Sequence, residues 1–226
     1  MGTVSAIVSA YYAQKYIDAR LVNLESLSPR PEIIVVAQKG SVEAETAKQH
    51  DCIYILTEDI PTIYAAWNIA IRASNCDYIT NANCDDKTFE YAYWVMAEYL
   101  DNDPNISLVY GANAIVENDI NGNRCVTYHA RPDHAPDWLA ALQKACFVGP
   151  MPMWRKSLHD KYGYFNPSYT SAGDYEFWLW IAKCGEQFKC LDVLIGKYTR
   201  RPDSLEFRDV RLSRIEAAKI RKLYGG

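Results

Sequence analysis

Several signatures of familiar protein classes are missing from this chain of 226 residues. Its 7 cysteines contain no CxxC pair, and its 4 histidines make no zinc-like spacing with them, which argues against a structural zinc site. The cysteines are odd in number and widely scattered, so we expect small buried thiols in a reducing compartment and no disulfide framework. These features predict a cytoplasmic protein.

Targeting, membrane and nucleic-acid signatures are also missing. The N-terminus lacks a basic region, and Ser5 and Ser9 interrupt its apolar stretch, so we expect no signal peptide. No apolar run approaches the roughly 20 residues that a helix needs to cross a bilayer. A net charge of −4 argues against a nucleic-acid partner, which would require a basic surface. We therefore expect a soluble protein.

Glycine-rich and nucleophile motifs are absent as well. No GxGxxG follows the first predicted strand, and neither a Walker lysine loop nor a GxSxG elbow occurs. Dehydrogenase, kinase-like NTPase and α/β-hydrolase functions are therefore poorly supported.

The first half of the chain alternates short β-branched runs with helical patterns. Glu32–Val36 is the clearest strand, because a near-continuous apolar run suits a parallel strand that is covered on both faces. The alternation predicts right-handed βαβ units in an open parallel sheet, which binds ligands at the carboxyl ends of its strands. The expected strands are Val4–Val8, Glu32–Val36, Cys52–Leu56, Tyr78–Thr80 and Ser107–Tyr110, and the expected helices are Lys15–Leu27, Val42–Gln49, Thr62–Ala73 and Thr88–Leu100.

The second half has a different pattern. Ala112–Glu117 and Arg124–Tyr128 flank Asn121-Gly122, which predicts a β-hairpin. A very apolar helix is expected to begin at Asp174, and a basic helix closes the chain. With no repeat, linker or low-complexity tract, we predict one continuous domain with two functional halves, residues 1–111 and 112–226.

An acidic cluster follows the fourth predicted strand and includes Asn83, Asp85 and Asp86. Carboxylates and amide oxygens at the carboxyl end of a strand are typical of a hard-oxygen site that holds Mg²⁺ or Mn²⁺ on phosphates. The alternative is a polar turn in which Asp86 caps the next helix.

The order of these segments resembles the family 2 glycosyltransferases, which have the GT-A fold and use nucleotide-activated sugars. The resemblance implies an α/β, Rossmann-like domain, with a mostly parallel central sheet flanked by helices and a smaller antiparallel part on the acceptor side. Residues 1–111 would bind the nucleotide sugar, and residues 112–226 would bind the acceptor and carry the catalytic base. The matching segments are Val4–Tyr12, Glu32–Val36 with Gly40-Ser41, Ala65–Ala70, Asp77–Ile79, Phe147–Ser157, Tyr162–Phe165 and Gly173–Leu179.

The resemblance also assigns a metal site, with two departures. The family's Asp-x-Asp motif has Asn83 at its first position here, which leaves Asp85 and Asp86 as ligands of a weakly held Mn²⁺ or Mg²⁺. Arg201 stands at about the place of a histidine that completes the site in many members. A guanidinium cannot bind a metal but can pair with phosphate, so Arg201 would share the neutralisation of the diphosphate.

The remaining site residues are implied in the same way. Tyr11 would stack on the base, Gln38 stands where an aspartate commonly reads uracil, and Trp67 replaces an arginine. Met153 and Trp154 would form an acceptor wall, or they belong to the core. The residues assigned to the nucleotide sugar are Ser9, Tyr11, Gln38, Trp67, Asn68, Asn83 and Arg201.

Asp174 is the expected catalytic base, and its alternative role is to cap its helix. Glu176 is a rival base, but two residues along a helix it should point elsewhere. The expected function is inverting transfer of a sugar from a nucleotide-sugar donor, UDP-linked, to a hydroxyl of a saccharide or lipid-linked acceptor.

Three alternatives stay open. The chain could be a catalytically impaired module that binds nucleotides or carbohydrates, or a nucleotidyltransferase, although the latter should carry a basic glycine-rich loop after the first strand. The closing basic helix is either a solvated face or a peripheral contact with anionic lipid at the inner membrane surface. Its cationic residues are Arg208, Arg211, Arg214, Lys219, Arg221 and Lys222.

Overall fold

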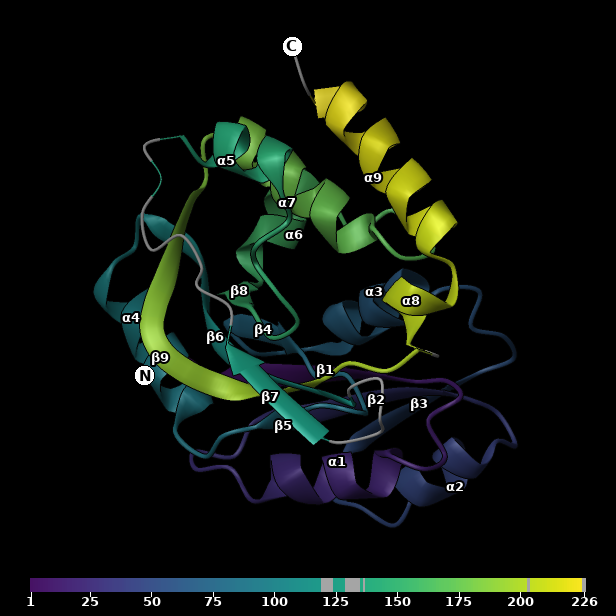
Figure 1. The fold of residues 1–226 in the computed structure, drawn as a ribbon. Coiled ribbons are helices and arrows are strands. Elements are labelled where there is room, and N and C mark those ends of the chain that lie inside the picture. Colours follow the sequence, from purple (N-terminus) through teal and green to yellow (C-terminus); the bar gives the residue numbers. More distant parts are fainter. Residues whose placement is uncertain (119–123, 129–134, 136, 203, 225–226) are drawn as a thin grey trace.

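The computed structural model describes residues 1–118, 124–128, 135, 137–202 and 204–224. They form a nine-stranded curled sheet in the order β3-β2-β1-β4-β8-β6-β9-β5, with β7 paired to β6 beside this path. Helices cover both faces of the sheet (Figure 1). The strands are β1 (Val4–Ala10), β2 (Glu32–Gln38), β3 (Ile53–Thr57), β4 (Tyr78–Asn81), β5 (Lys87–Thr88), β6 (Ile106–Asn118), β7 (Arg124–Tyr128), β8 (Met153–Arg155) and β9 (Gln187–Thr199).

Two hydrophobic cores lie on opposite faces of the sheet. One core packs under α1, α2 and α4, and the other packs under α3, α5, α6, α7 and α9. Successive residues of a central strand serve different cores, since Ile34 faces one and Val35 the other. The helices are α1 (Ile17–Glu25), α2 (Val42–Ala47), α3 (Ile63–Ala73), α4 (Ala92–Asn102), α5 (Trp138–Lys144), α6 (Ser157–Tyr162), α7 (Gly173–Lys183), α8 (Leu205–Arg208) and α9 (Val210–Tyr224).

The N-terminal part of the sheet has the predicted parallel topology. β1 pairs in parallel with both β2 and β4, and β2 pairs in parallel with β3. The middle of β2, Ile33 to Ala37, is buried throughout, which explains why the sequence shows a continuous apolar run there. The carboxyl ends of β1, β2 and β4 therefore meet at one edge of the sheet.

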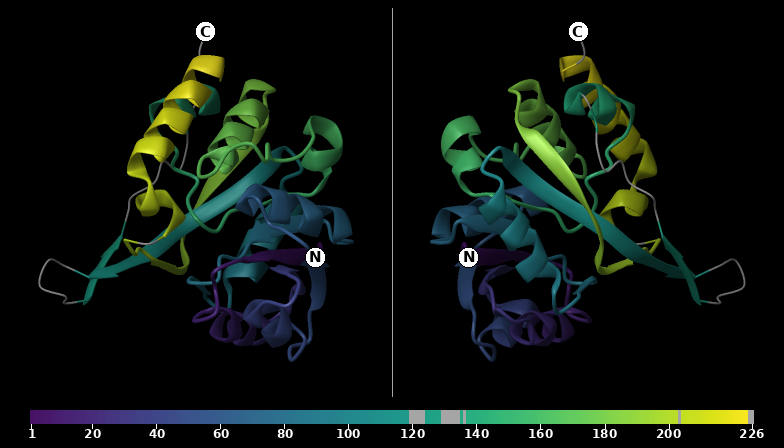
Figure 2. Two further views of the ribbon diagram at one scale, coloured as in Figure 1. Left: turned by 90° about the vertical axis from the view of Figure 1, so that its right-hand side faces the viewer. Right: turned by 90° about the vertical axis from the view of Figure 1, so that its left-hand side faces the viewer.

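The C-terminal part mixes strand directions and curls away. β8 is antiparallel to both β4 and β6, and β6 runs parallel to β9 over most of its length. The register of β6 and β9 shifts at Gly111, where a Cβ atom would lie 2.8 Å from the carbonyl oxygen of Val193. Glycine permits that close approach of the two strands. Farther along, β6 and β7 form a ribbon that projects from the rest of the molecule (Figure 2).

Several elements differ from the sequence predictions. The segments 107–110 and 112–117 are one strand, β6, which passes through the proposed boundary at residue 111. The helix expected from Thr88 begins at Ala92, because Lys87 and Thr88 pair with β9 as β5. Both flanking strands of the predicted hairpin exist and pair, while its turn, Asn121-Gly122, lies outside the described residues. Two expected buried thiols, Cys146 and Cys184, are exposed.

An aromatic cluster around α6 and α7 holds a buried histidine. His159 is 3 % exposed and stacks between Phe177 and Tyr164. Its Nε2 accepts a hydrogen bond from Nε1 of Trp154 (2.8 Å), and its Nδ1 lies 3.0 Å from the carbonyl oxygen of Gly163. This pairing requires the neutral imidazole with its proton on Nδ1, because Nε2 must accept.

We predict that His159 makes stability fall in mild acid. Burial lowers the pKa of His159 to about 4 from an ordinary 6.5. The unfolded chain therefore binds the proton first, and the contribution of His159 is complete above pH 6.5 and is lost as the pH falls toward 4. Between pH 7 and 4, the free energy of unfolding should fall by about 3 kcal/mol more in the wild type than in His159→Gln.

Urea unfolding at a series of pH values measures this difference, and parallel profiles for the two proteins would contradict it. His50→Gln is the control. Its side chain is partly buried, which lowers its pKa, but hydrogen bonds to Glu25 and Asp18 outweigh this and raise the pKa overall. Between pH 7 and 4, the free energy of unfolding of His50→Gln should therefore fall more than that of the wild type, whereas that of His159→Gln should fall less.

Candidate active site at the carboxyl ends of the strands

Two segments far apart in the sequence are joined where β4 and β9 end. The loop after β4 carries Asn83, Asp85 and Asp86, and the chain leaving β9 carries Arg201. The Oδ1 of Asp86 accepts a hydrogen bond from the backbone N–H of Thr199 (3.0 Å), which ties the loop to the last residue of β9. The structure thus brings four of the predicted site residues into one cluster.

Asp85 and Arg201 form an ion pair within this cluster. Both Nη2 (2.9 Å) and Nε (3.2 Å) of Arg201 donate to Oδ2 of Asp85. Nη1 of Arg201 donates to the hydroxyl of Tyr16 (2.8 Å), and the guanidinium carbon lies 4.4 Å from the centre of the Tyr16 ring. The two charged side chains are 17 % and 23 % exposed, so the pair lies half-buried with an accessible edge.

Asp86 is more buried than Asp85 and holds the loop after β4 through a hydrogen bond within it. It is 6 % exposed, and its Oδ2 accepts from Nδ2 of Asn83 (3.2 Å). Burial and the neighbouring charge of Asp85 raise the pKa of Asp86 to about 7. The alternative role in helix capping is wrong, since α4 begins at Ala92 and no side chain caps its start.

The donor set of this cluster does not fit the predicted Mn²⁺ or Mg²⁺. Such an ion takes a shell of oxygens that includes one or two carboxylates. Asp85 is already neutralised by Arg201, and both oxygens of Asp86 accept hydrogen bonds from the chain. Oδ1 of Asn83 is buried without a hydrogen-bond partner in the described structure, but it is a single neutral oxygen. Among those same residues no three His, Cys, Asp or Glu side chains form a metal-binding group.

The expected base, Asp174, lies in the first turn of α7 and is oriented by α3. The hydroxyl of Tyr64 donates to Oδ1 of Asp174 (3.0 Å). Burial, and then the charge of Asp174, raise the pKa of Tyr64 well above its ordinary value, so the phenol stays a hydrogen-bond donor. Gly173 makes this contact possible, because a Cβ there would lie 2.7 Å from the Tyr64 ring. Asp174 does not cap α7, whose N-cap residue is Ala172.

The rival base, Glu176, is directed elsewhere. Its Oε1 accepts a hydrogen bond from the hydroxyl of Tyr224 at the end of α9, and burial raises the pKa of this carboxyl group. Glu176 therefore serves the contact between α7 and α9, as its spacing from Asp174 predicts.

A buried carboxylate that the sequence analysis missed supports the loop before α7. Glu216 of α9 is 7 % exposed and accepts hydrogen bonds from the backbone N–H groups of Thr170 (2.8 Å), Ser171 (2.9 Å) and Ala172 (3.0 Å). It thereby holds the backbone that leads directly to Asp174. The sequence does not single out Glu216 for this role, because it is one of many charged residues in a basic helix and lies 44 residues from Ala172.

Three predicted nucleotide-sugar residues lie at the edge where the parallel strands end. Ser9 is the second-last residue of β1, Tyr11 directly follows this strand, and Gln38 is the last residue of β2. Tyr11 is 42 % exposed, and its ring lies 4.3 Å from that of Tyr12. Nε2 of Gln38 donates to the carbonyl oxygen of Glu58 (3.2 Å), which orients its amide at this edge.

Four other predicted site residues lie in the core instead. Both polar atoms of the Asn68 amide are used by the backbone of Phe165, with Nδ2 donating to its oxygen (2.7 Å) and Oδ1 accepting from its nitrogen (3.1 Å). Trp67 is 5 % exposed, and Met153 and Trp154 are fully buried. Met153 and Trp154 offer no surface to an acceptor because β8 is an internal strand with helices over both faces. Trp67 and Asn68 lie on the buried face of α3.

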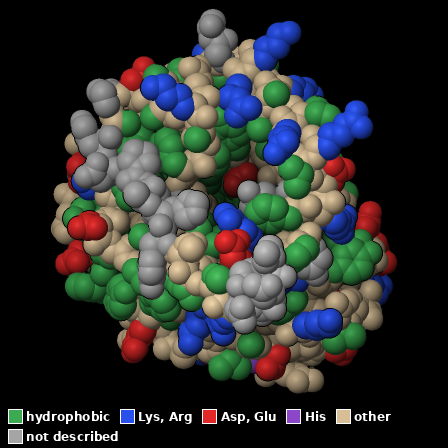
Figure 3. All heavy atoms as spheres, in the orientation of Figure 1, with side chains coloured by type: hydrophobic (Ala, Val, Ile, Leu, Met, Phe, Trp, Pro, Cys, Tyr) green, Lys and Arg blue, Asp and Glu red, His purple; other side chains and the backbone are tan. Residues whose placement is uncertain are grey.

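The surface over this part of the molecule is hollowed (Figure 3). Acidic and basic side chains lie at the bottom of the hollow, between the sheet and the helical layer that contains α5, α7 and α9. No helix in the described ranges is long and apolar enough to cross a membrane.

We predict that Glu216 is essential for the stability of the loop before α7. Glu216→Ala leaves three backbone N–H groups without their acceptor, which should lower the free energy of unfolding by about 2–4 kcal/mol. Glu216→Gln keeps one acceptor oxygen and should lose less. Urea unfolding measures both variants, and an effect of Glu216→Ala within about 0.5 kcal/mol of zero, as for an ordinary surface substitution, would contradict the role.

No protein-family model and no curated protein sequence matches this chain. Solved structures do. A fragment of TarS from S. aureus, residues 1–349 in complex with UDP-GlcNAc, matches with a TM-score of 0.70 at 15 % identity, covering 98 % of this chain and 71 % of that one. The mannosyltransferase PcManGT from Pyrobaculum calidifontis, in complex with GDP-Man and Mn²⁺, matches with a TM-score of 0.69 at 15 % identity, covering 100 % and 65 %. The predicted fold is thereby confirmed: this chain has the GT-A fold of nucleotide-sugar glycosyltransferases.

Proposed function

We propose that this chain is an inverting glycosyltransferase that moves a sugar from a UDP-linked donor to a hydroxyl of a saccharide or lipid-linked acceptor. The observation that carries the proposal is the placement of Asp174, at the start of an apolar helix and oriented by Tyr64. The fold adds support, since the similar structures were solved with UDP-GlcNAc and GDP-Man.

The donor would lie along the edge where β1, β2 and β4 end. Tyr11 offers an exposed ring for stacking on the base, and Gln38 offers an amide for its polar edge. The diphosphate would lie near Arg201, which is the predicted phosphate-binding residue of the cluster. Open parallel sheets bind their ligands at this edge in general.

The proposed reaction is a single displacement. The carboxylate of Asp174 takes the proton of the acceptor hydroxyl while the hydroxyl oxygen forms a bond with the anomeric carbon of the donor sugar. The bond between that carbon and the diphosphate oxygen breaks on the opposite face, and the nucleoside diphosphate leaves with the electron pair. Tyr64 fixes Oδ1 of Asp174, so the orientation of the base is set before the acceptor arrives.

The second candidate is a module that binds nucleotides or carbohydrates without turnover. The neutral Asn83 and the occupied Asp85 favour it, because both reduce the metal affinity that the family's motif would supply. Release of free nucleotide from a panel of nucleotide sugars, with acceptor saccharides present, separates the two candidates.

We predict that Asp174→Asn abolishes transfer and leaves nucleotide binding intact. An amide cannot accept the proton, so turnover should fall by about 10²- to 10⁴-fold, while UDP affinity stays within about twofold of the wild type. Nucleotide release and isothermal titration calorimetry measure the two quantities. Asp192→Asn, an exposed change on β9, is the control. Wild-type turnover in Asp174→Asn would refute the assignment of the base.

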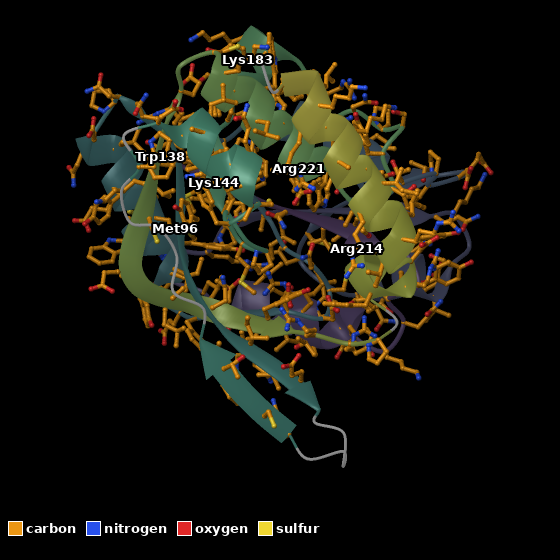
Figure 4. The ribbon with its side chains drawn as sticks, turned by 45° about the horizontal axis from the view of Figure 1, so that its top comes forward. Met96, Trp138, Lys144, Lys183, Arg214 and Arg221 are labelled. Carbon is orange, nitrogen blue, oxygen red and sulfur yellow. The ribbon has the colours of Figure 1, made fainter. Side chains whose placement is uncertain are left out.

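The outer face of α9 supports a peripheral contact with anionic lipid. Val210 and Ile215 are 40 % and 54 % exposed, and they line a shallow groove of about 650 Å³ together with Arg211, Arg214 and Ala218. Figure 4 shows α5, α7 and α9 side by side, with Lys144, Lys183, Arg214 and Arg221 on these three helices. Cationic side chains beside exposed apolar ones suit the surface of an anionic bilayer, where a lipid-linked acceptor would be found.

We predict that the protein floats with vesicles that contain phosphatidylserine and stays in the soluble fraction with pure phosphatidylcholine. The double variant Arg211→Glu/Arg214→Glu should lower the vesicle partition coefficient at least tenfold, since each cationic side chain near such a surface contributes about 1 kcal/mol. Flotation in sucrose gradients measures this. Equal recovery of wild type and variant with anionic vesicles would dismiss the contact.

A further inference from the structure

The most unusual feature of the candidate site is Arg201, which stands at about the place of a histidine that completes the metal or diphosphate site in many family 2 glycosyltransferases. Arg201 is fixed on three sides, by two hydrogen bonds to Asp85 (2.9 and 3.2 Å), one to the hydroxyl of Tyr16 (2.8 Å), and the face of the Tyr16 ring at 4.4 Å. Such a guanidinium is preorganised, because little side-chain freedom remains to be lost when an anion binds.

The neighbouring arginine has a different set of partners. Arg200 pairs with Glu117 of β6 (3.3 Å) and lies over the ring of Phe207 (5.4 Å). The two consecutive arginines therefore serve different contacts, and only Arg201 joins the cluster with Asp85. This makes Arg200 a matched control for Arg201.

A second arginine is buried beside the segment that follows Asp86. Arg20 of α1 is 1 % exposed, and its Nε and Nη2 have no hydrogen-bond partner in the described part of the chain. The hydroxyl of Thr88, two residues after Asp86, accepts a hydrogen bond from Nη1 of Arg20. Its guanidinium is anchored by Asn23 (2.8 Å) and Thr88 (3.1 Å).

The ion pair between Asp85 and Arg201 takes the place that a metal would need. The carboxylate of Asp85 is already neutralised by the guanidinium of Arg201, at 2.9 Å. A divalent ion entering here would have to displace Arg201 from Asp85 and then lie beside a displaced positive charge. Protein and metal thus compete for the same carboxylate.

We infer that Arg201 replaces the divalent cation at the diphosphate site, so that nucleotide binding by this chain needs no metal. Asp85 is then a positioning residue that holds the guanidinium, and the accessible edge of the pair is where the diphosphate oxygens bind. This inference rests on the proposed nucleotide-sugar function and deepens it.

Titration calorimetry with UDP and GDP tests the inference in the presence of EDTA and, separately, of Mn²⁺. The wild type should bind with the same affinity in both buffers, within about threefold. Arg201→Ala should weaken binding by at least tenfold and Arg201→Lys by less, because lysine keeps the charge without the bidentate geometry. Arg200→Ala should stay within about threefold. Circular dichroism confirms that the variants are folded.

Electron paramagnetic resonance of Mn²⁺ alone gives a second readout, in which the protein should leave the signal of the free ion unchanged. Nucleotide binding that requires Mn²⁺, or metal-independent binding that Arg201→Ala does not weaken, overturns the inference and leaves the proposed transfer standing. Absence of UDP and GDP binding in both buffers overturns the inference together with the proposed function.

Discussion

The link between the loop after β4 and the end of β9 organises the candidate site. The backbone of Thr199 donates to Asp86, and the side chain of Arg201 donates to Asp85, so two segments more than 110 residues apart are fixed against each other. β9 itself is joined to the parallel half through β6, β8 and β4, and this link fixes the chain that leaves β9 against the loop after β4. The polar loop that resembles a metal motif thus acts as a protein-internal clamp.

Contacts between distant segments also position the expected base. Asp174 itself is held by Tyr64 from α3, and the loop before it is held by Glu216 from α9. Both contacts come from elements that pack on the same core under α7, so the position of the base depends on the whole helical layer. Packing of this kind orients a carboxylate more firmly than a surface loop can.

The sequence predicted the parallel half of the fold well and the antiparallel half poorly. Continuous apolar runs such as Ile33 to Val36 are distinctive, because strands buried on both faces leave little choice of residue. The sequence did not predict β9, because its pattern of buried and exposed residues is irregular where its register with β6 shifts. β8 has only three residues, and the residue types of Met153 and Trp154 suit a ligand surface as well as the core that they occupy. Long-range partners such as Glu216 leave no local pattern at all.

The proposed transfer requires one cleft that holds a diphosphate beside Arg201 and faces Asp174. A crystal structure with bound UDP tests this most directly. We expect diphosphate oxygens within hydrogen-bonding distance of the Arg201 guanidinium, and the carboxyl group of Asp174 at the wall of the same cavity, at the start of α7. UDP bound at another surface, or Asp174 separated from the nucleotide by the core, would contradict it.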